Sequence, residues 1–411
     1  MKTLPRFIQI STLTTYPASL LNRDDSGLSK RVPFGGSSRT RISSQCLKRH
    51  WRMADDLWSL KNVDPQIAIS VRSRKIFPEL VERPLIAEGL DAVKVAAASL
   101  ALQSILYGEK GTEAISKSKK PKKKDEAQAD LLLDDDQVTG GDRSELIVLG
   151  HPEIQYITQV VRNTVLQSSD AVDADRNAKT WFKEHRKEFQ ALKCGAGLDA
   201  AMFGRFISGD TDARVSAAVH VAHAFTVHAE ESETDYFTAV DDLDPNHGSA
   251  HINATELTTG IFYGYVAIDV PLLVSNIEGC AQSDWQEADR SVAGRLVKHL
   301  LHLIATVTPG AKLGSTAPYA RPWLILTEAG DAQPRTLADA FYSPVPLNKG
   351  DARMKALSQL AQYITRSDEM YGQNGSRWVA SMYDQQIPSA EVLSLDAMGD
   401  ALEKIVVDAV L

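Results

Sequence analysis

Four polar side chains follow one face of a predicted helix near the N-terminus. They are Gln45, Lys48, Arg49 and Arg52, spaced i, i+3, i+4 and i+7, a spacing that shares one side of a helix. Cations at one-turn intervals near a helix N-terminus suit a phosphate backbone. A solvated helix face is the alternative, but such faces usually mix charge signs, and this turn contains no acid. The stripe therefore favours nucleic-acid binding.

Positive charge is concentrated in the first 52 residues, which hold ten Lys or Arg and two acids, Asp24 and Asp25. Their net charge is +8, whereas the whole chain of 411 residues carries −8. The remaining residues therefore carry −16. This asymmetry is typical of a protein that faces a polyanion at one end. The loop before the helix adds Asn22, Arg23, Arg39 and Arg41 to this region.

Two adjacent aromatic residues, Tyr236 and Phe237, lie with Thr238 in a segment that is too polar to be core. Exposed aromatic rings stack on bases and grip single strands with little sequence preference. A local hairpin that covers one of the rings explains the same spacing equally well. Both interpretations are open from the residues alone.

Residues able to do catalysis or bind metals do not form a recognisable set. Asp24 and Asp25 could serve metal-ion chemistry, but a loop carboxylate pair beside Arg23 and Lys30 is more often salt-bridged. A histidine trio at positions 220, 223 and 228 lacks a nearby Cys or carboxylate to complete a metal site. The glycines form neither a phosphate-binding loop nor a dinucleotide fingerprint. We therefore expect no catalytic residues, no metal and no cofactor, and a metabolic enzyme is disfavoured.

The composition is that of an ordinary globular protein, with 43% hydrophobic and 24% charged residues. The three cysteines are odd in number and lack metal-like spacing, which fits a reducing compartment. No apolar run is long enough to span a membrane. These features predict a cytoplasmic protein.

Periodicity predicts a strand over 7–15 and a helix over about 45–58, with Ser43 or Ser44 as its N-cap. The core stripe of this helix would be Leu47, Trp51, Ala54 and Trp58. Helical patterns continue through 62–108 and 151–208. Between them, the lysine-rich segment 116–142 is typical of a disordered loop.

The second half of the chain alternates predicted helices and strands. Helices are expected over 213–228, 284–306, 352–365 and 395–409, and strands over 261–269 and 323–326. With the first strand and helix, this order indicates an α+β fold with a ferredoxin-like or RNA-recognition core.

Short motifs along the chain match a known family in the same order. They are LNRDD at 21–25, FGG at 34–36, RISSQ at 41–45 with LKR at 47–49, GRF at 204–206, DYFTAVDDL at 235–243, GSAH at 248–251, FYGY at 262–265 and PGAK at 309–312. Together they resemble the CasC backbone subunit of the type I-E CRISPR Cascade complex, within the repeat-associated mysterious protein superfamily.

The resemblance implies a modified RNA-recognition palm, an insertion of helical fingers and a β-hairpin thumb. The palm would begin with the first strand and basic helix at 1–61 and continue at 209–411, with the thumb at about 230–260. The fingers would occupy 62–208 and include the disordered loop. Further copies of the chain would polymerise along a CRISPR RNA, with other Cascade subunits and target DNA as partners and no membrane.

The resemblance also assigns residue roles. Guide phosphates would be held by Asn22, Arg23, Ser43, Gln45, Lys48 and Arg52, with Lys312 as a further contact. Phe206 would stack on the guide, and Tyr236, Phe237 and Thr238 would wedge at a displaced base. Such a scaffold reads no sequence itself. The alternative is a type III-like backbone subunit that also cleaves target RNA with Asp24 or Asp25.

Overall fold

The computed structural model describes residues 4–107, 146–191, 195–205, 214–240, 249–348, 350–373 and 375–408. The chain forms two compact units. The helical unit is Asp64–Ala217, and the sheet unit joins Met1–Val63 to Ala218–Leu411. The expected boundaries were 61/62 and 208/209. The loop predicted over 116–142 lies entirely outside the described residues, and so does Phe206.

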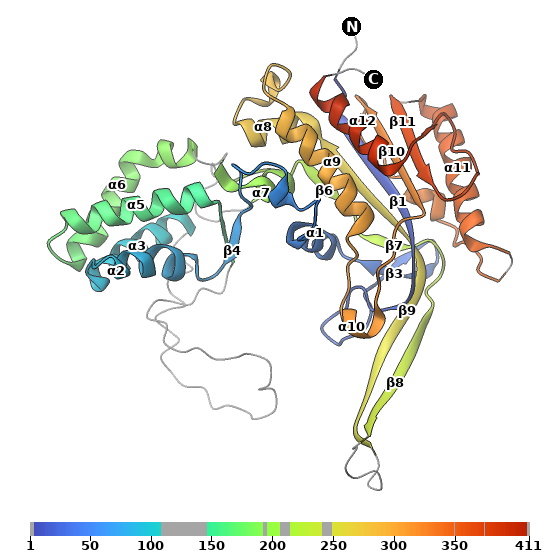
Figure 1. The fold of residues 1–411 in the computed structure, drawn as a ribbon, viewed down its shortest axis with the longest axis horizontal. Helices are drawn as coiled ribbons and strands as arrows, with labels where there is room; N and C mark the ends of the chain where they lie inside the picture. Colours follow the sequence, from blue (N-terminus) through green and yellow to red (C-terminus); the bar gives the residue numbers. More distant parts are fainter. Residues whose placement is uncertain are drawn as a thin grey trace. The chain divides into compact units, whose positions relative to one another are not determined.

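The sheet unit is built on strands that are mostly antiparallel (Figure 1). They are β1 (Phe7–Ser19), β2 (Arg31–Phe34), β3 (Ser37–Ile42), β6 (Val219–Val221), β7 (Ala224–Thr226), β8 (Ser232–Val240), β9 (Ser249–Asp269), β10 (Leu324–Gly330), β11 (Ser376–Ser381) and β12 (Glu391–Val392). Among the described residues these form one ten-stranded sheet in the order β12-β11-β10-β1-β9-β7-β3-β2, with β6 and β8 paired to β9. Only the short β11–β12 pair is parallel within these residues.

The first strand is predicted correctly and continues to Ser19. It lies between β10 and β9, so that Leu13 pairs with both Leu324 and Tyr263. Helices cover both faces of this central strand, and Ile8, Ile10 and Leu13 are fully buried. A strand buried on both faces reads as a nearly continuous β-branched and apolar run, which is the pattern of FIQISTLTT.

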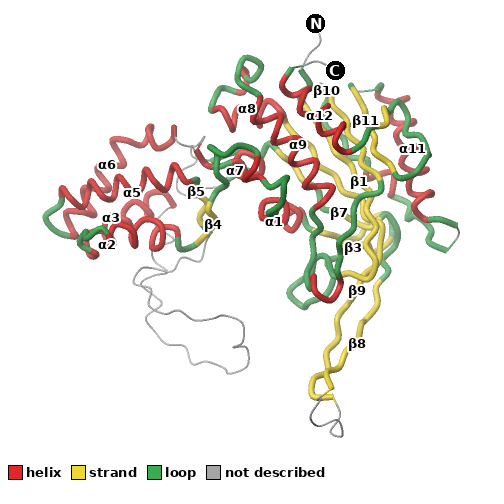
Figure 2. Tube along the Cα trace, in the orientation of Figure 1, coloured by secondary structure: helices red, strands yellow, loops and turns green. Residues whose placement is uncertain are grey.

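Six helices in the described part of the sheet unit pack around this sheet: α1 (Ser44–Met53), α8 (Val270–Glu278), α9 (Ser291–Thr306), α10 (Leu313–Thr316), α11 (Ala352–Tyr371) and α12 (Leu395–Val407). Short 3₁₀ turns are η1 (Leu60–Asn62), η6 (Gln282–Asp284) and η7 (Ala338–Phe341). In Figure 2, α9 and α12 lie side by side. Leu357, Leu360 and Ile364 of α11 pack in one core with Leu13 and Tyr263. This α+β architecture agrees with the predicted fold class.

The helical unit comprises the strands β4 (Val71–Ser73) and β5 (Ile147–Leu149) and the helices η2 (Ile76–Glu82), α2 (Arg83–Ala87), α3 (Ala92–Tyr107), α5 (His151–Gln167), α6 (Ala171–Ala191) and α7 (Leu198–Phe203). Its own core includes Phe77, Leu85 and Val161. Arg205, in the GRF motif, forms a fully buried ion pair with Glu153 at 2.5 Å. This pair anchors Arg205 to α5.

Three predicted helices need correction. The segment predicted as a helix over 213–228 instead contributes β6 and β7, because both pair with the side of the long strand β9 that does not pair with β1. The helix predicted from 284 begins at Ser291, after the turn η6. The basic helix ends at Met53, since Ala54 is extended with a ψ of 139°. Trp58 therefore lies outside it and stacks on His302 of α9, with ring centroids 3.5 Å apart.

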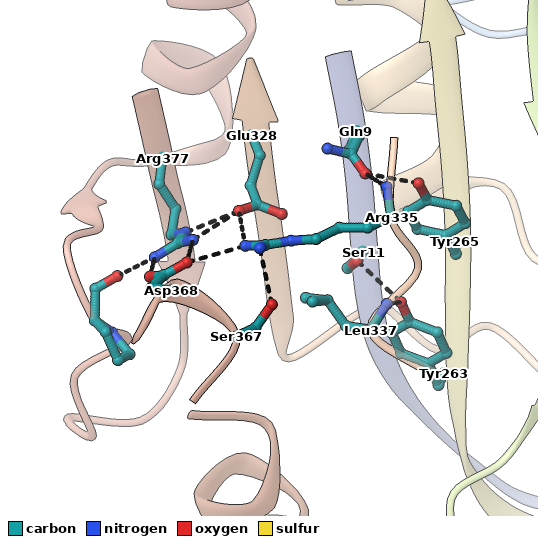
Figure 3. A network of polar contacts seen from close by, with 11 residues as sticks. Gln9, Ser11, Tyr263, Tyr265, Glu328, Arg335, Leu337, Ser367, Asp368 and Arg377 are labelled. Carbon is teal, nitrogen blue, oxygen red and sulfur yellow. Dashed lines mark hydrogen bonds and ion pairs between the residues drawn. The ribbon is translucent and has the colours of Figure 1, made fainter. Parts of the chain in front are cut away.

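A buried polar network ties α11 and β11 to the centre of the sheet (Figure 3). Arg377 donates to Glu328 at 2.8 Å and to Asp368 at 2.8 Å. Arg335 donates to Asp368 at 3.0 Å, and its backbone N–H donates to Gln9. The charges of two arginines thus balance those of two carboxylates on the side of the sheet that α11 covers. None of the helices in the described ranges is both long and apolar enough to cross a membrane.

Candidate nucleic-acid interface

The N-terminus of α1 is held by side chains from distant parts of the sheet unit. Ser43 is the N-cap, and its Oγ accepts the Cys46 N–H at 3.3 Å. The Ser43 N–H donates to Asn22 Oδ1 at 2.9 Å, and the Ser44 N–H donates to His223 Nδ1 at 3.1 Å. The predicted cap is confirmed. Because two first-turn amides are already paired, cationic side chains are the main attraction here for an anion.

The predicted polar stripe lies on the outer side of α1. Gln45 and Arg49 are exposed, while Lys48 and Arg52 are half-buried and have interactions within the protein. The opposite side of the helix packs inward through Trp51, which is 3% exposed. The helix is therefore amphipathic as the sequence predicts, with Gln45 and Arg49 toward solvent and Lys48 and Arg52 partly covered.

Two further cations approach the N-terminal end of α1 from neighbouring segments. Arg41 Nη1 lies 3.4 Å from His223 Nδ1, and its Nε donates to the Arg31 carbonyl at 3.1 Å. Burial lowers the pKa of His223, and the charges of Arg41 and Lys30 lower it further. Burial raises the pKa of Cys46, and the charges of Lys30 and Arg49 reduce this rise without cancelling it. The same few cations therefore create a positive potential at two separate groups around this helix end.

One of the loop cations is structural rather than part of this surface. Arg39 is completely buried, and it donates to the carbonyls of Phe34, Thr226 and Phe341 at 3.1–3.2 Å. Burial lowers its pKa. The sequence pattern groups Arg39 with exposed arginines because it cannot reveal that three carbonyls converge on this position. Arg23, in contrast, is exposed.

The Asp pair lies in the tight turn after β1. Asp24 Oδ1 accepts the backbone N–H groups of Ser26 at 2.9 Å and Leu28 at 3.0 Å. This is a turn-forming role typical of Asp. Asp25 is exposed. Among the described residues, no group of three or more His, Cys, Asp or Glu side chains is placed to hold a metal ion.

Tyr236, Phe237 and Thr238 lie on β8, in the hairpin that β8 forms with β9. Their backbone partners on β9 are Ala254, Asn253 and Ile252, in that order. Tyr236 is 63% exposed, so its ring is not covered by the hairpin. The side chains of the other two lie outside the described part of the chain. The hairpin projects beyond the rest of the sheet (Figure 2).

Lys312 lies beside the base of the hairpin. Its backbone is left-handed, with a φ of 57°, and the preceding Ala311 N–H donates to the Leu20 carbonyl at 2.8 Å. The Lys312 Nζ donates to Thr255 Oγ1 on β9 at 2.5 Å. This lysine therefore contacts the hairpin in addition to the role that the family resemblance implies.

The sequence reasoning missed two residues of this region. His223 was considered only as a metal ligand, yet it accepts a hydrogen bond from the first turn of α1. Arg31 was counted only as charge, yet it forms ion pairs with Glu230 and Glu256. The partners lie about 180 to 225 residues away in the chain, so no local pattern could identify them.

Comparison with known proteins identifies a family and similar solved structures. The model of a family described as CT1975-like protein matches residues 8–407. No curated protein matches. A chain in a solved structure described as "CRISPR RNA-guided surveillance complex, pre-nicking" is 26% identical, with a TM-score of 0.68, and the match covers 96% of this chain and 100% of that one. A chain of another, "CRISPR RNA-guided surveillance complex", is 24% identical with a TM-score of 0.63, and 96% and 99% are covered.

The family match extends over nearly the whole described sheet unit and the whole described helical unit. It thus includes α1 with its cationic stripe, the β8–β9 hairpin and the loop of Lys312. The chain belongs to the CT1975-like protein family.

Proposed function

We propose that this protein is a CRISPR-RNA-binding backbone subunit of a Cascade-type surveillance complex, of the type I-E CasC kind. The observation that carries the proposal is the full-length similarity to a chain of a CRISPR RNA-guided surveillance complex. Because a fold can host many functions, the proposal also needs a suitable surface. The cations around the N-terminus of α1 supply it, since phosphate contacts give affinity for any guide sequence.

In this proposal, the guide backbone runs along the outer side of α1. Gln45, Lys48, Arg49 and Arg52 contact successive phosphates, and Arg23 and Arg41 extend the contacts toward the preceding loop. Asn22 and Ser43 contribute mainly by fixing the helix N-terminus, since each is engaged in a hydrogen bond there. Phe206 stacks on the guide, and Lys312 adds a backbone contact.

The β8–β9 hairpin would act as the thumb. Tyr236, Phe237 and Thr238 wedge at one displaced base per subunit, so that the bases between wedges remain available for pairing with target DNA. The exposed ring of Tyr236 supports this role, since base stacking on an aromatic ring contributes about 1–3 kcal/mol. Several copies polymerise along one guide with other Cascade subunits, and the subunit is not catalytic.

The alternative is a subunit that also cleaves RNA with Asp24 or Asp25. The position of Asp24 argues against it, because Oδ1 is occupied by two backbone N–H groups. Cleavage of guide-paired RNA that requires a divalent metal and is lost in Asp24→Ala with Asp25→Ala would establish the alternative. Intact RNA in a fully assembled complex would exclude it.

The phosphate contacts are tested by the salt dependence of RNA binding. Lys48→Ala with Arg52→Ala should weaken binding equally for RNAs of unrelated sequence. It should also reduce the slope of log K against log salt by about 1.4, since each phosphate neutralised on a single strand contributes about 0.7. Arg353→Ala with Lys355→Ala, on α11, removes the same charge and should leave the slope unchanged. Equal slopes in both double variants would remove α1 from the RNA path.

A further inference from the structure

At the base of the β8–β9 hairpin, one arginine lies between two carboxylates. Arg31, on β2, forms ion pairs with Glu230, just before β8, and with Glu256, on β9. Their side chains are 16% and 9% exposed, and that of Arg31 is 34% exposed. Burial lowers the pKa of Arg31, but hydrogen bonds and charge attraction from Glu230 and Glu256 outweigh burial and raise it. We call these three residues the Arg31 clasp.

Both carboxylates of the Arg31 clasp are fixed by additional hydrogen bonds. Glu256 Oε2 accepts the Ser29 N–H at 2.6 Å, and Glu230 Oε2 accepts the Ser38 hydroxyl at 3.0 Å. The Glu230 backbone N–H donates to the Ser38 carbonyl at 2.9 Å. Residues of the β2–β3 hairpin and the loop before it therefore contact Glu230 and Glu256, at the base of both strands of the β8–β9 hairpin.

Near these contacts, β9 stops pairing with β1 and continues as part of the β8–β9 hairpin. Thr258 is the last β9 residue that pairs with β1, through Ser19. From Leu257 to Ser249, the described pairs of β9 are with β8 alone. A two-stranded ribbon is only marginally stable in isolation, so the contacts at its base determine its direction. Glu256 lies two residues beyond the last pair with β1.

The same arginine is connected to the cationic surface. Its backbone carbonyl accepts a hydrogen bond from Arg41 Nε at 3.1 Å, and Arg41 in turn lies beside His223 at the N-terminus of α1. Arg31 thus joins the hairpin through its side chain and the phosphate-binding region through its backbone. Its own guanidinium faces two carboxylates, which neutralise it as a phosphate contact.

We propose that Arg31 is a positioning residue that sets the direction of the β8–β9 hairpin relative to the cationic side of α1. The proposal rests on the proposed function, because it links the site of phosphate binding to the place where the hairpin meets the guide. Without the Arg31 clasp, the guide is still bound, but the hairpin no longer meets it at one defined nucleotide. Arg31 therefore controls the accuracy of base displacement and not the affinity for RNA.

The test compares the full chain, assembled on a guide RNA, as wild type, Arg31→Ala and Arg31→Lys. Chemical probing of the guide measures the contrast between displaced and stacked bases. Arg31→Ala should reduce this contrast at least threefold, while Kd changes less than twofold and the salt slope stays the same. Arg31→Lys, which keeps the charge, should restore most of the contrast. Arg353→Ala removes an equal charge from α11 and should behave as wild type.

Two results of the guide experiment would overturn the proposal. Unchanged contrast in Arg31→Ala would mean that the hairpin is held by other contacts. A salt slope reduced by about 0.7 would mean that Arg31 itself binds a phosphate. If the wild type binds no guide, the proposed function fails, and hydrogen exchange in the RNA-free chain then decides the structural part. Faster exchange of the β8 and β9 amides in Arg31→Ala than in Arg353→Ala supports the Arg31 clasp, and equal exchange refutes it.

Discussion

Two clusters of arginine and carboxylate side chains hold the same sheet in different ways. Under α11, Arg335 and Arg377 balance Glu328 and Asp368 in a largely buried network. At the hairpin base, one arginine serves two glutamates and remains 34% exposed. Removing one partner from the charge-balanced cluster leaves an unpaired buried charge, which is costly. An ion pair whose arginine is 34% exposed contributes less to the free energy of unfolding. The comparison separates a contact that maintains the fold from one that directs a projecting element.

The largest effect is expected from breaking the buried cluster. Asp368→Asn leaves Arg335 and Arg377 with Glu328 as their remaining carboxylate, and it should lower the free energy of unfolding by about 3 kcal/mol. Urea denaturation at pH 7 measures this loss. Asp384→Asn, at an exposed position, should change it by less than about 0.5 kcal/mol. An equal loss in both variants would remove the difference between buried and exposed acids on which the comparison depends.

The contribution of Asp368 should also depend on pH. Burial raises its pKa, but Arg377 and Arg335 outweigh burial and hold it below the ordinary value of 3.8. A carboxyl with a depressed folded-state pKa stabilises fully above its unfolded pKa, and this stabilisation disappears as pH falls through the folded value. The difference between wild type and Asp368→Asn should therefore be constant from pH 7 to 5 and shrink below about pH 4. A constant difference down to pH 2 would contradict this assignment.

An intermediate effect concerns the second contact at the hairpin base. Thr255→Val removes the hydrogen bond between Lys312 Nζ and Thr255 Oγ1 but keeps the lysine charge. Lys312→Ala removes both the hydrogen bond and the charge. If Lys312 also binds the guide, the alanine variant alone should lose about 0.7 in salt slope. Salt titrations of RNA binding distinguish the two variants. Equal slopes would mean that Lys312 acts only on the hairpin.

The smallest effect is expected at His223. His223→Ala leaves the Ser44 N–H without its acceptor, which should cost about 1 kcal/mol in the free energy of unfolding. His223→Asn keeps a side-chain acceptor and is the matched comparison, because its amide oxygen can take the place of Nδ1. Thermal and urea denaturation of both variants measure this contribution. A stability equal to wild type in the alanine variant would show that solvent replaces the histidine fully.

Local patterns were sufficient for elements whose burial follows one period. The strand from Phe7, the N-cap at Ser43 and the inward side of α1 at Trp51 are all as predicted. The segment that forms β6 and β7 was wrongly predicted, because its apolar residues fit a helical period as well and only pairing with β9 selects strands.

Charged residues were less predictable than apolar ones. Arg39 and Arg31 lie eight residues apart on neighbouring strands, yet Arg39 is buried among carbonyls and Arg31 binds two acids. Except for the Phe34 carbonyl, which lies five residues from Arg39, their partners come from segments that are remote in sequence and are brought close by the fold. The sign of a charge can be read from a sequence, but its partner depends on topology.

The most direct test of the account is the RNA that the protein carries. The chain is purified from cells that co-express a CRISPR array and the partner subunits, and the bound RNA is extracted and sized. The account predicts a high 260/280 nm absorbance ratio and one discrete RNA of guide length, protected in a particle with several copies of this chain. An RNA-free monomer obtained under these conditions would contradict it.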